Sequence, residues 1–331
     1  MDIQVVISQM AVLFILIGIG YVAGKIKLLT PEAVKVLSNI VLNISTPSTI
    51  LYSVMGDTGG ITGGKTVNFL LFSLLAYALL FVVGVPSSQL LSAKHRDRGQ
   101  GSRVRGQKTI VLDDSGKMPG SSNRGLYCCM IAFGNTGFMG IPIGMAIFGT
   151  ESMFYLSVYN IIFQVLVYSV GIVIISGKGS EIKIKTLINA AFVASILAFI
   201  IAFTDFRTPF VISDALRLAS GLNTPCAMFV IGATLSRIPV KDVFVKWRLY
   251  PITFLKIIAA PVLVWLVLRQ FVTDELMLGI LVVLSAMPTA AAVPMISIEY
   301  GGDEKIASSG VFLSTLLSGL TIPLIVYMLL I

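Results

Sequence analysis

The most informative stretch of the sequence is Gly134-Asn135-Thr136-Gly137-Phe138-Met139-Gly140-Ile141-Pro142. It lies at the centre of an apolar run that is long enough to cross a membrane. A second such run carries Met287-Pro288-Thr289-Ala290-Ala291-Ala292-Val293-Pro294 at its centre. Proline removes a backbone donor and clashes with the preceding turn, while glycine tolerates dihedral angles that other residues resist. Both runs therefore predict helices that are interrupted near the middle of the lipid.

The composition places the chain in a bilayer. Of its 331 residues 56% are hydrophobic and 12% are charged, and the mean hydropathy is +0.93. A single soluble core would leave too much of this apolar surface in water. Runs of spanning length predict ten transmembrane helices, with ends set to within several residues: 3–23, 32–55, 67–91, 126–149, 153–176, 184–204, 209–235, 246–270, 275–298 and 306–331.

The basic residues predict the orientation. Eighteen Lys and Arg residues lie in the connections on one side of the membrane, against three (Lys65, Arg207 and Arg269) on the other. By the positive-inside rule both termini face outward from a cell membrane. The formal charge of +8 is thus a topology signal, and we expect no nucleic-acid partner. The basic connection 92–124 is expected to be a cytoplasmic loop, whose role as a tether, a lipid-headgroup contact or a regulatory docking strip stays open.

Histidine and cysteine usage excludes most hydrolytic chemistry. His95 is the single histidine and lies in a charged stretch, and Cys128, Cys129 and Cys226 show no CxxC spacing. Neither a His-based triad nor a Cys/His zinc site can be built from them. With no nucleophile and base pair visible, we expect no enzymatic activity, no metal and no cofactor.

Two motifs recur in the two halves of the chain. Thr46-Pro47 in the second run matches Thr224-Pro225 in the seventh, and Pro142 in the fourth matches Pro294 in the ninth. This predicts two five-helix repeats, 1–176 and 177–331, of which the first carries the loop insertion. Because five is odd, the second repeat enters the membrane inverted, as in many secondary transporters. We therefore predict an all-α membrane fold in which the broken fourth and ninth helices cross.

Crossed broken helices predict a preference for anions. The N-terminal ends of half-helices carry positive dipole charge, and unwound backbone survives at this depth only inside protein or beside a watery cavity. Asn135 supplies donors and an acceptor at the first break, and Thr289 is the polar side chain of the second. No acidic cluster that would hold sodium or relay protons is evident, so the membrane potential alone can drive export of an anion.

Other intramembrane polar residues have two interpretations each. Asn43 and Asn223 lie near the Thr-Pro motifs, where either scaffold hydrogen bonds or substrate contacts explain them. Asn160 and Gln164, four apart on one helix face, most simply bond to the broken fourth helix and are also candidate substrate contacts. Lys256 is a deep charge with no acidic neighbour on its own helix, so it either snorkels toward the cytoplasm or attracts a substrate carboxylate.

These motifs resemble those of the auxin efflux carrier family, in particular its short prokaryotic members. The stretch from Gly134 to Pro142, continuing to Gly149, is similar to the family's fourth-helix signature, and the run 159–164 resembles its fifth helix. The segment from Met287 to Gly301 is similar to its ninth helix. The likeness covers nearly the whole chain apart from about 95 to 123. One departure is that the long loop joins the third and fourth helices, whereas plant members carry theirs between the fifth and sixth.

The resemblance implies a ten-helix fold of two inverted repeats, related to bile-acid transporters and sodium/proton antiporters. It implies a scaffold of helices 1, 2, 6 and 7, a transport domain of helices 3 to 5 and 8 to 10, elevator-type alternating access and a homodimer. By the same analogy Asn135, Pro142, Pro288 and Pro294 lie at the crossover and touch the carboxylate of an organic acid.

The predicted function is a membrane carrier that exports small organic anions, with auxin-like and other carboxylates as candidates. Two alternatives stay open. One is ion-coupled uptake of a dicarboxylate such as malate or malonate. The other is a non-transporting membrane sensor in which a bound ligand moves the basic loop 92–124.

Overall fold

The protein is helical almost throughout in a computed structural model, which describes residues 3–53, 55, 63–93, 123–149, 152–176, 190–202, 209–238, 240–300 and 302–330. Within these ranges β pairing is limited to one isolated bridge, between Gly134 and Thr289. The predicted all-α class is therefore confirmed. Most of the basic loop predicted over 92–124 lies outside the described residues.

The helices follow the predicted ranges closely. Several are continued by a single turn of π-helix, named η, and two are interrupted by coil. In chain order they are α1 (Ile3–Lys25); α2 (Pro31–Ile40), η1 (Val41–Ser45) and α3 (Thr46–Ser53); α4 (Gly63–Ala93); α5 (Arg124–Ala132), η2 (Thr136–Gly140) and α6 (Ile141–Phe148); α7 (Met153–Leu166), η4 (Val167–Gly171) and α8 (Ile172–Ser176); α10 (Ala190–Ala202); α11 (Phe210–Ser220) and α12 (Asn223–Leu235); α13 (Val240–Val245); α14 (Leu249–Phe254), η5 (Leu255–Ala259) and α15 (Ala260–Leu268); α16 (Glu275–Ser285) and α17 (Ala292–Tyr300); and α18 (Glu304–Leu330).

The longest of these helical stretches have the length and the apolar composition of membrane spans. Within the described ranges, five are long and apolar enough to cross a bilayer: Lys65–Leu91, Met153–Ser176, Phe210–Leu235, Leu249–Leu268 and Glu304–Leu330. Three shorter apolar helices, Met10–Lys25, Thr136–Phe148 and Glu275–Ser285, accompany them. The last two of these flank the breaks that the sequence predicts.

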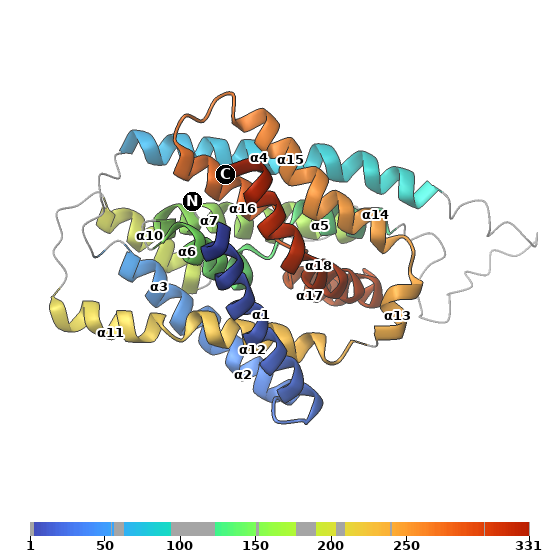
Figure 1. Cartoon of the computed structure of the whole chain (residues 1–331), viewed down its shortest axis with the longest axis horizontal. Coiled ribbons are helices and arrows are strands. Elements are labelled where there is room, and N and C mark those ends of the chain that lie inside the picture. The colour runs from blue at the N-terminus through green and yellow to red at the C-terminus, as the bar shows by residue number, and fades with distance from the viewer. Residues whose placement is uncertain are drawn as a thin grey trace, which may run out of the picture.

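One group of helices is organised around a close contact between α1 and α12. A Cβ atom on Gly20 would lie 2.6 Å from the carbonyl oxygen of Phe229, and one on Gly232 would overlap the carbonyl oxygen of Ile17. Glycine thus lets the two backbones touch, which is a common way for membrane helices to pack. α2 packs on α12, and α3 packs on α10 and α11. Figure 1 shows α1, α2, α3, α11 and α12 together in the lower part of the view.

A second group contains the long helix α4. It packs along α5 and also contacts α15, which lies against α16. The C-terminal helix α18 packs on α17 and α14. Figure 1 shows α4, α15 and α16 in the upper part of the view, and α18 descending beside them. The two breaks lie within this second group.

Candidate functional site

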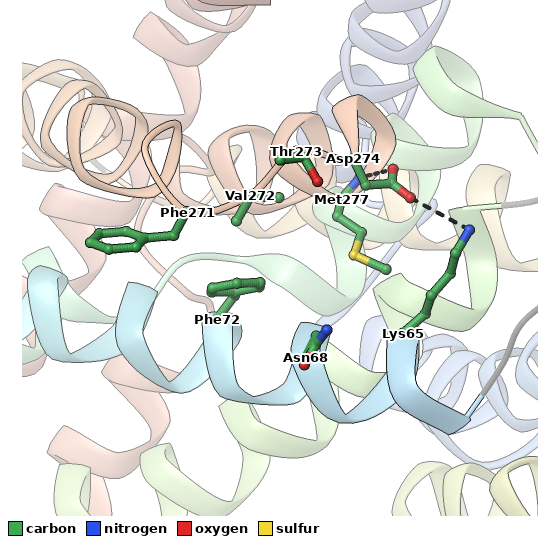
Figure 2. Close-up of a pocket in the computed structure, with 8 residues that line it drawn as sticks. All are labelled: Lys65, Asn68, Phe72, Phe271, Val272, Thr273, Asp274 and Met277. Atoms are coloured by element: carbon green, nitrogen blue, oxygen red, sulfur yellow. Dashed lines mark hydrogen bonds and ion pairs between the residues drawn. The ribbon is translucent and has the colours of Figure 1, made fainter.

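A hollow among the described residues lies away from the site residues that the sequence predicts. It is a pocket of roughly 280 Å³ between the start of α4 and the residues that precede α16, and Figure 2 shows its lining. The Nζ atom of Lys65 lies 3.8 Å from a carboxylate oxygen of Asp274. The other Asp274 oxygen accepts the backbone N–H groups of Leu276 and Met277, so this carboxylate caps α16. The pair therefore joins two helix starts and has a structural role.

Both predicted helix breaks are present. Residues 133–135 separate α5 from η2, and residues 286–291 separate α16 from α17. The first break lies before Pro142 rather than at it, because Pro142 occupies the first turn of α6, where a missing N–H does least harm. In the second break Pro288 lies in the coil, whereas Pro294 lies inside α17.

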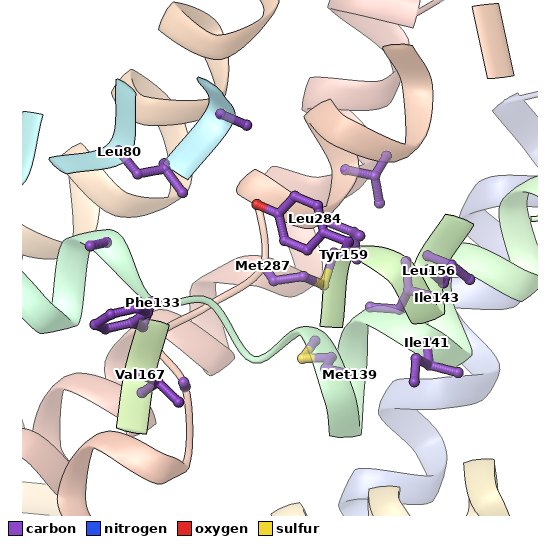
Figure 3. Close-up of a cluster of buried hydrophobic side chains, with 14 of the residues drawn as sticks. Leu80, Phe133, Met139, Ile141, Ile143, Leu156, Tyr159, Val167, Leu284 and Met287 are labelled. Carbon is purple, nitrogen blue, oxygen red and sulfur yellow. The ribbon is translucent and has the colours of Figure 1, made fainter. Parts of the chain in front are cut away.

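The two breaks are hydrogen-bonded to each other. The N–H of Asn135 donates to the carbonyl oxygen of Pro288 at 2.7 Å, and the N–H of Ala290 donates to that of Phe133 at 3.0 Å. Figure 3 shows the coil after Phe133 passing the coil that carries Met287, inside a cluster of buried apolar side chains. Each break thus satisfies backbone groups of the other, which is the condition for unwound backbone at membrane depth.

Gly134 is at the point of closest approach. A Cβ atom there would lie 3.2 Å from the Nζ atom of Lys256, 3.2 Å from the Cβ atom of Met287 and 3.3 Å from the carbonyl oxygen of Leu284. These three atoms, from η5, the end of α16 and the second break, leave room for a glycine only. They would have to move to admit any side chain.

The helix ends that precede the breaks are capped by side chains from elsewhere. The hydroxyl of Thr289 donates to the carbonyl oxygen of Met130, in the last turn of α5, at 3.0 Å. The ammonium of Lys256 donates to the carbonyl oxygen of Ser285, the last residue of α16, at 3.2 Å. Carbonyl groups at a helix C-terminus carry partial negative charge, which donors and cations stabilise.

Lys256 is the unexpected member of this arrangement. It lies in η5 with its side chain fully buried, so its ammonium does not snorkel to the surface. Of the residues whose burial is described, it is the single charged one in the buried class. Neither of the ion pairs found between described residues, Lys65 with Asp274 and Arg217 with Asp214, involves it. A lysine amine without an acidic partner among the described residues thus lies directly behind the two breaks.

Asn160 braces the first turn after the first break, as predicted. Its side-chain nitrogen donates to the carbonyl oxygens of Leu156 at 2.9 Å and Thr136 at 3.3 Å. Its side-chain oxygen accepts the hydroxyl of Thr136 at 2.9 Å. Gln164 lies one turn further along α7 and is half-buried.

The two other predicted asparagines differ in their surroundings. Asn135 is buried, and its backbone carbonyl accepts the N–H groups of Met139 and Gly140, while its side-chain amide bonds to no described residue. Asn43 is exposed on η1 and donates to the carbonyl oxygen of Asn39 in its own helix at 3.1 Å. The structure therefore brings Asn135 to the breaks with an available amide, and it does not bring Asn43 there.

The sequence profile of a membrane transport protein family matches residues 5–101, 117–188 and 181–326. The chain belongs to this family. The resemblance to the auxin efflux carriers is thereby confirmed at the family level. The transporter is a multi-pass membrane protein, and the stretch 102–116, which the profile leaves unmatched, lies within the basic loop predicted from the sequence.

Three relatives carry transporter names. An uncharacterized transporter of Methanocaldococcus jannaschii is 24% identical over 321 residues, which cover 95% of each chain. An uncharacterized transporter of Methanothermobacter thermautotrophicus is 25% identical over 318 residues, or 94% of each chain. A protein of Rhizobium meliloti, provisionally named a malonate transporter, is 25% identical over 209 residues, which cover 60% of this chain and 64% of the relative.

The transporter also joins its two Thr-Pro motifs directly. The hydroxyl of Thr46 donates to the side-chain oxygen of Asn223 at 3.0 Å, and the hydroxyl of Ser45 donates to the carbonyl oxygen of Ala219 at 2.9 Å. Of the two interpretations of Asn223, a scaffold hydrogen bond is therefore the one observed. The repeated motif contained the signal for this contact, but its partner could not be read from the sequence.

The half-helices that follow the two breaks begin at half-buried residues, and we call these two starts the open side of the breaks. Gly137 and Phe138, at the start of η2, and Ala291 and Ala292, at the start of α17, are half-buried, whereas residues 133–136 and 286–290 are buried. Phe138 packs against a small apolar cluster built on Val34, Val230 and Ala233, from α2 and α12. The first turn of η2 therefore faces the helix group that contains α1 and α12.

Proposed function

We propose that this transporter is a carrier of small organic anions, binding them at the open side of the two breaks. The observation that carries the proposal is the Lys256 ammonium, buried behind the breaks without an acidic partner among the described residues. A charge in a low-dielectric interior acts over a longer range than it does in water, so it favours a negative solute nearby and opposes a positive one. A cation carrier would need the opposite sign at this place.

The anion would meet donors from both half-helices. The first turn of a helix presents N–H groups without partners in the helix, and the starts of η2 and α17 are both half-buried rather than fully enclosed. The free amide of Asn135 adds donors beside them. Pro142, Pro288, Pro294 and Thr289 shape the two turns, Asn160 fixes the first of them, and Gln164 lies one turn beyond Asn160.

The proposed architecture has ten spans in two inverted repeats, residues 1–176 and 177–331. Three pairs of features support it. Each half has a helix that ends at a break and resumes after it, each of these helix ends is capped by a donor from another segment, and each half has a Thr-Pro motif that bonds to the other half. Five-helix repeats of opposite orientation would place the two breaks against each other near the membrane midplane.

The two helix groups suggest how the carrier would move. We propose that α1 to α3 and α10 to α12 form a scaffold, and that α4 to α8 and α14 to α18 form the transport domain. The breaks belong to the second group, and the start of η2 faces the first through the contacts of Phe138. Elevator motion of one group past the other would then expose the anion on alternate sides. We further propose a homodimer formed by the scaffold in a cell membrane, with both termini outside.

Flux measurements in proteoliposomes test the proposal. Vesicles loaded with labelled malonate, malate or indole-3-acetate are held at a potassium diffusion potential, and efflux is compared with protein-free vesicles. An outward anion carrier should release at least one of them faster when the side corresponding to the cytoplasm is negative. Flux of none of the three would refute the proposal, and flux that requires sodium or a pH gradient would instead indicate ion-coupled uptake.

A deletion separates the carrier from a sensor. Removal of residues 95–123 takes away most of the basic loop, including the stretch 102–116 that the family profile does not match. A carrier should keep its flux after this deletion. A sensor whose output runs through the loop would show ligand binding but no flux in either form.

A further inference from the structure

We propose that Lys256 is the built-in counter-charge of the carrier, an ammonium that moves with the two breaks and cancels one negative charge of the anion that crosses. This inference rests on the proposed function, because it describes what the carrier moves together with its substrate.

The contacts of Lys256 attach it to both breaks at once. Its ammonium donates to Ser285, the residue at which α16 ends, and lies close to Gly134, where a Cβ atom would come within 3.2 Å of it. The π-helical turn that carries it, η5, packs against α5 and α18. Whichever helices shift during transport, Lys256 and the breaks shift as one body.

The capping of the helix end does not by itself require a charge. At the corresponding end of α5 the neutral hydroxyl of Thr289 caps the carbonyl of Met130 at 3.0 Å. A hydroxyl is therefore sufficient to satisfy such a carbonyl in this fold. The ammonium at α16 supplies the same hydrogen bond and a full positive charge in addition, at a position where burial makes a charge expensive to keep.

The charge is not balanced by a neighbour within the described residues. Their two ion pairs lie at partly exposed sites, and the buried class contains no acidic residue. With Lys256 protonated beside the bound anion, a carrier loaded with a monoanion moves with a charge of about 0, and a carrier loaded with a dianion moves with a charge of about −1. The membrane potential acts only on the net charge that moves through it.

The wild-type transporter provides the first test. Purified protein is placed in vesicles whose potential is clamped with potassium and valinomycin, and exchange of internal for external substrate is measured with malonate and with its monomethyl ester. Exchange involves only the loaded carrier. We expect the exchange rate of the monoester to be independent of the membrane potential. The exchange rate of malonate should depend on the potential as expected when one net charge crosses the membrane. If the monoester rate instead showed the voltage dependence of one net charge and the malonate rate that of two, the inference would be overturned.

Removing the charge provides the second test. Lys256→Gln keeps a donor for the Ser285 carbonyl and loses the ammonium, and Lys256→Met removes both. In either variant the voltage dependence of malonate exchange should become about twice as steep as in the wild type. A slope equal to that of the wild type would contradict the inference. Should both variants fail to fold, the wild-type comparison of malonate with its ester still decides.

Thr289→Val is the matched control, because it removes the neutral cap from the other half-helix. It should slow exchange and leave the slope against potential unchanged. A steeper slope in this variant would show that the effect arises from a damaged break rather than from the charge. If neither malonate nor any other carboxylate crosses in the wild type, the proposed function fails; if flux is present and the slopes disagree with these values, only the role of Lys256 fails.

Discussion

The hydroxyl of Thr46 donates a buried hydrogen bond of 3.0 Å to the side-chain oxygen of Asn223, a residue 177 positions further along the chain. Thr46→Val keeps the shape of the side chain and leaves this oxygen without its donor. We expect the variant to lose about 1–3 kcal/mol of stability, the usual cost of an unsatisfied buried group. Thermal unfolding in detergent measures it. Thr234→Val is the control, because that hydroxyl bonds only to Val230 in its own helix, and an equal loss in both would argue against the cross-chain bond.

Gly134→Ala should separate the two breaks. The new methyl group would press on Lys256, Met287 and the carbonyl of Leu284, all within 3.3 Å. Overpacking of this kind costs about 1–3 kcal/mol, and we expect anion flux to fall at least tenfold in protein that still inserts and folds. Gly18→Ala, where no heavy atom lies within 4 Å of the added carbon, should leave both flux and stability unchanged. Normal flux in Gly134→Ala would show that close approach of the breaks is not needed.

Asn135→Ala should weaken substrate binding without unfolding the protein. The backbone of Asn135 holds the break together, whereas its amide bonds to no described residue. A donor lost from a bound carboxylate corresponds to about 1.5–3 kcal/mol, so the apparent KM should rise roughly tenfold or more while the unfolding temperature stays the same. Asn43→Ala, at an exposed position, should change neither quantity. An unaltered KM in Asn135→Ala would remove this residue from the site.

Asn160→Leu tests the brace on the first half-helix. The substitution removes two donated bonds and one accepted bond around Thr136 and Leu156. We expect a loss of about 1–3 kcal/mol from the unsatisfied groups, together with lower flux because the first turn of η2 is no longer fixed. Ser157→Ala on the same helix loses only a bond to its own backbone, at Met153, and should show a clearly smaller change in both measurements.

Pro142→Ala should leave the first break in place. The break is held at residues 133–135 by hydrogen bonds to Pro288 and Ala290, and Pro142 lies beyond it in α6. We therefore expect more than half of the wild-type flux to remain. A complete loss of flux in folded protein would mean that this proline, rather than the contact between the coils, creates the break.

The sequence predicted the helices well because their signal is local. Apolar runs of spanning length placed nearly every helical stretch within a few residues, and the glycine and proline pattern identified the two helices that break. It placed the first break within the stretch from Gly134 to Pro142, and in the structure the break lies at the beginning of this stretch, at residues 133–135. The actual site, at Gly134, is selected by partners in the second break, more than 150 residues away, and no local pattern contains that information.

The site residues show the same division. The bond between Asn160 and the broken helix was predicted from its position on the same helix face as Gln164, four residues along. The direction of the Lys256 side chain could not be predicted, because snorkelling and burial are equally compatible with one lysine in an apolar run. In the structure the side chain is buried and bonds to the carbonyl of Ser285. The pairing of Thr46 with Asn223 likewise depends on how the two halves fold against each other.

The glycine contact between α1 and α12 has a mechanical consequence. Where two main chains touch without intervening side chains, as at Gly20 and Gly232, sliding by even one residue would drive a bulky group into a carbonyl oxygen. These two helices must therefore move together as one rigid unit. Any conformational change of the molecule has to occur at other helix interfaces, where side chains separate the backbones.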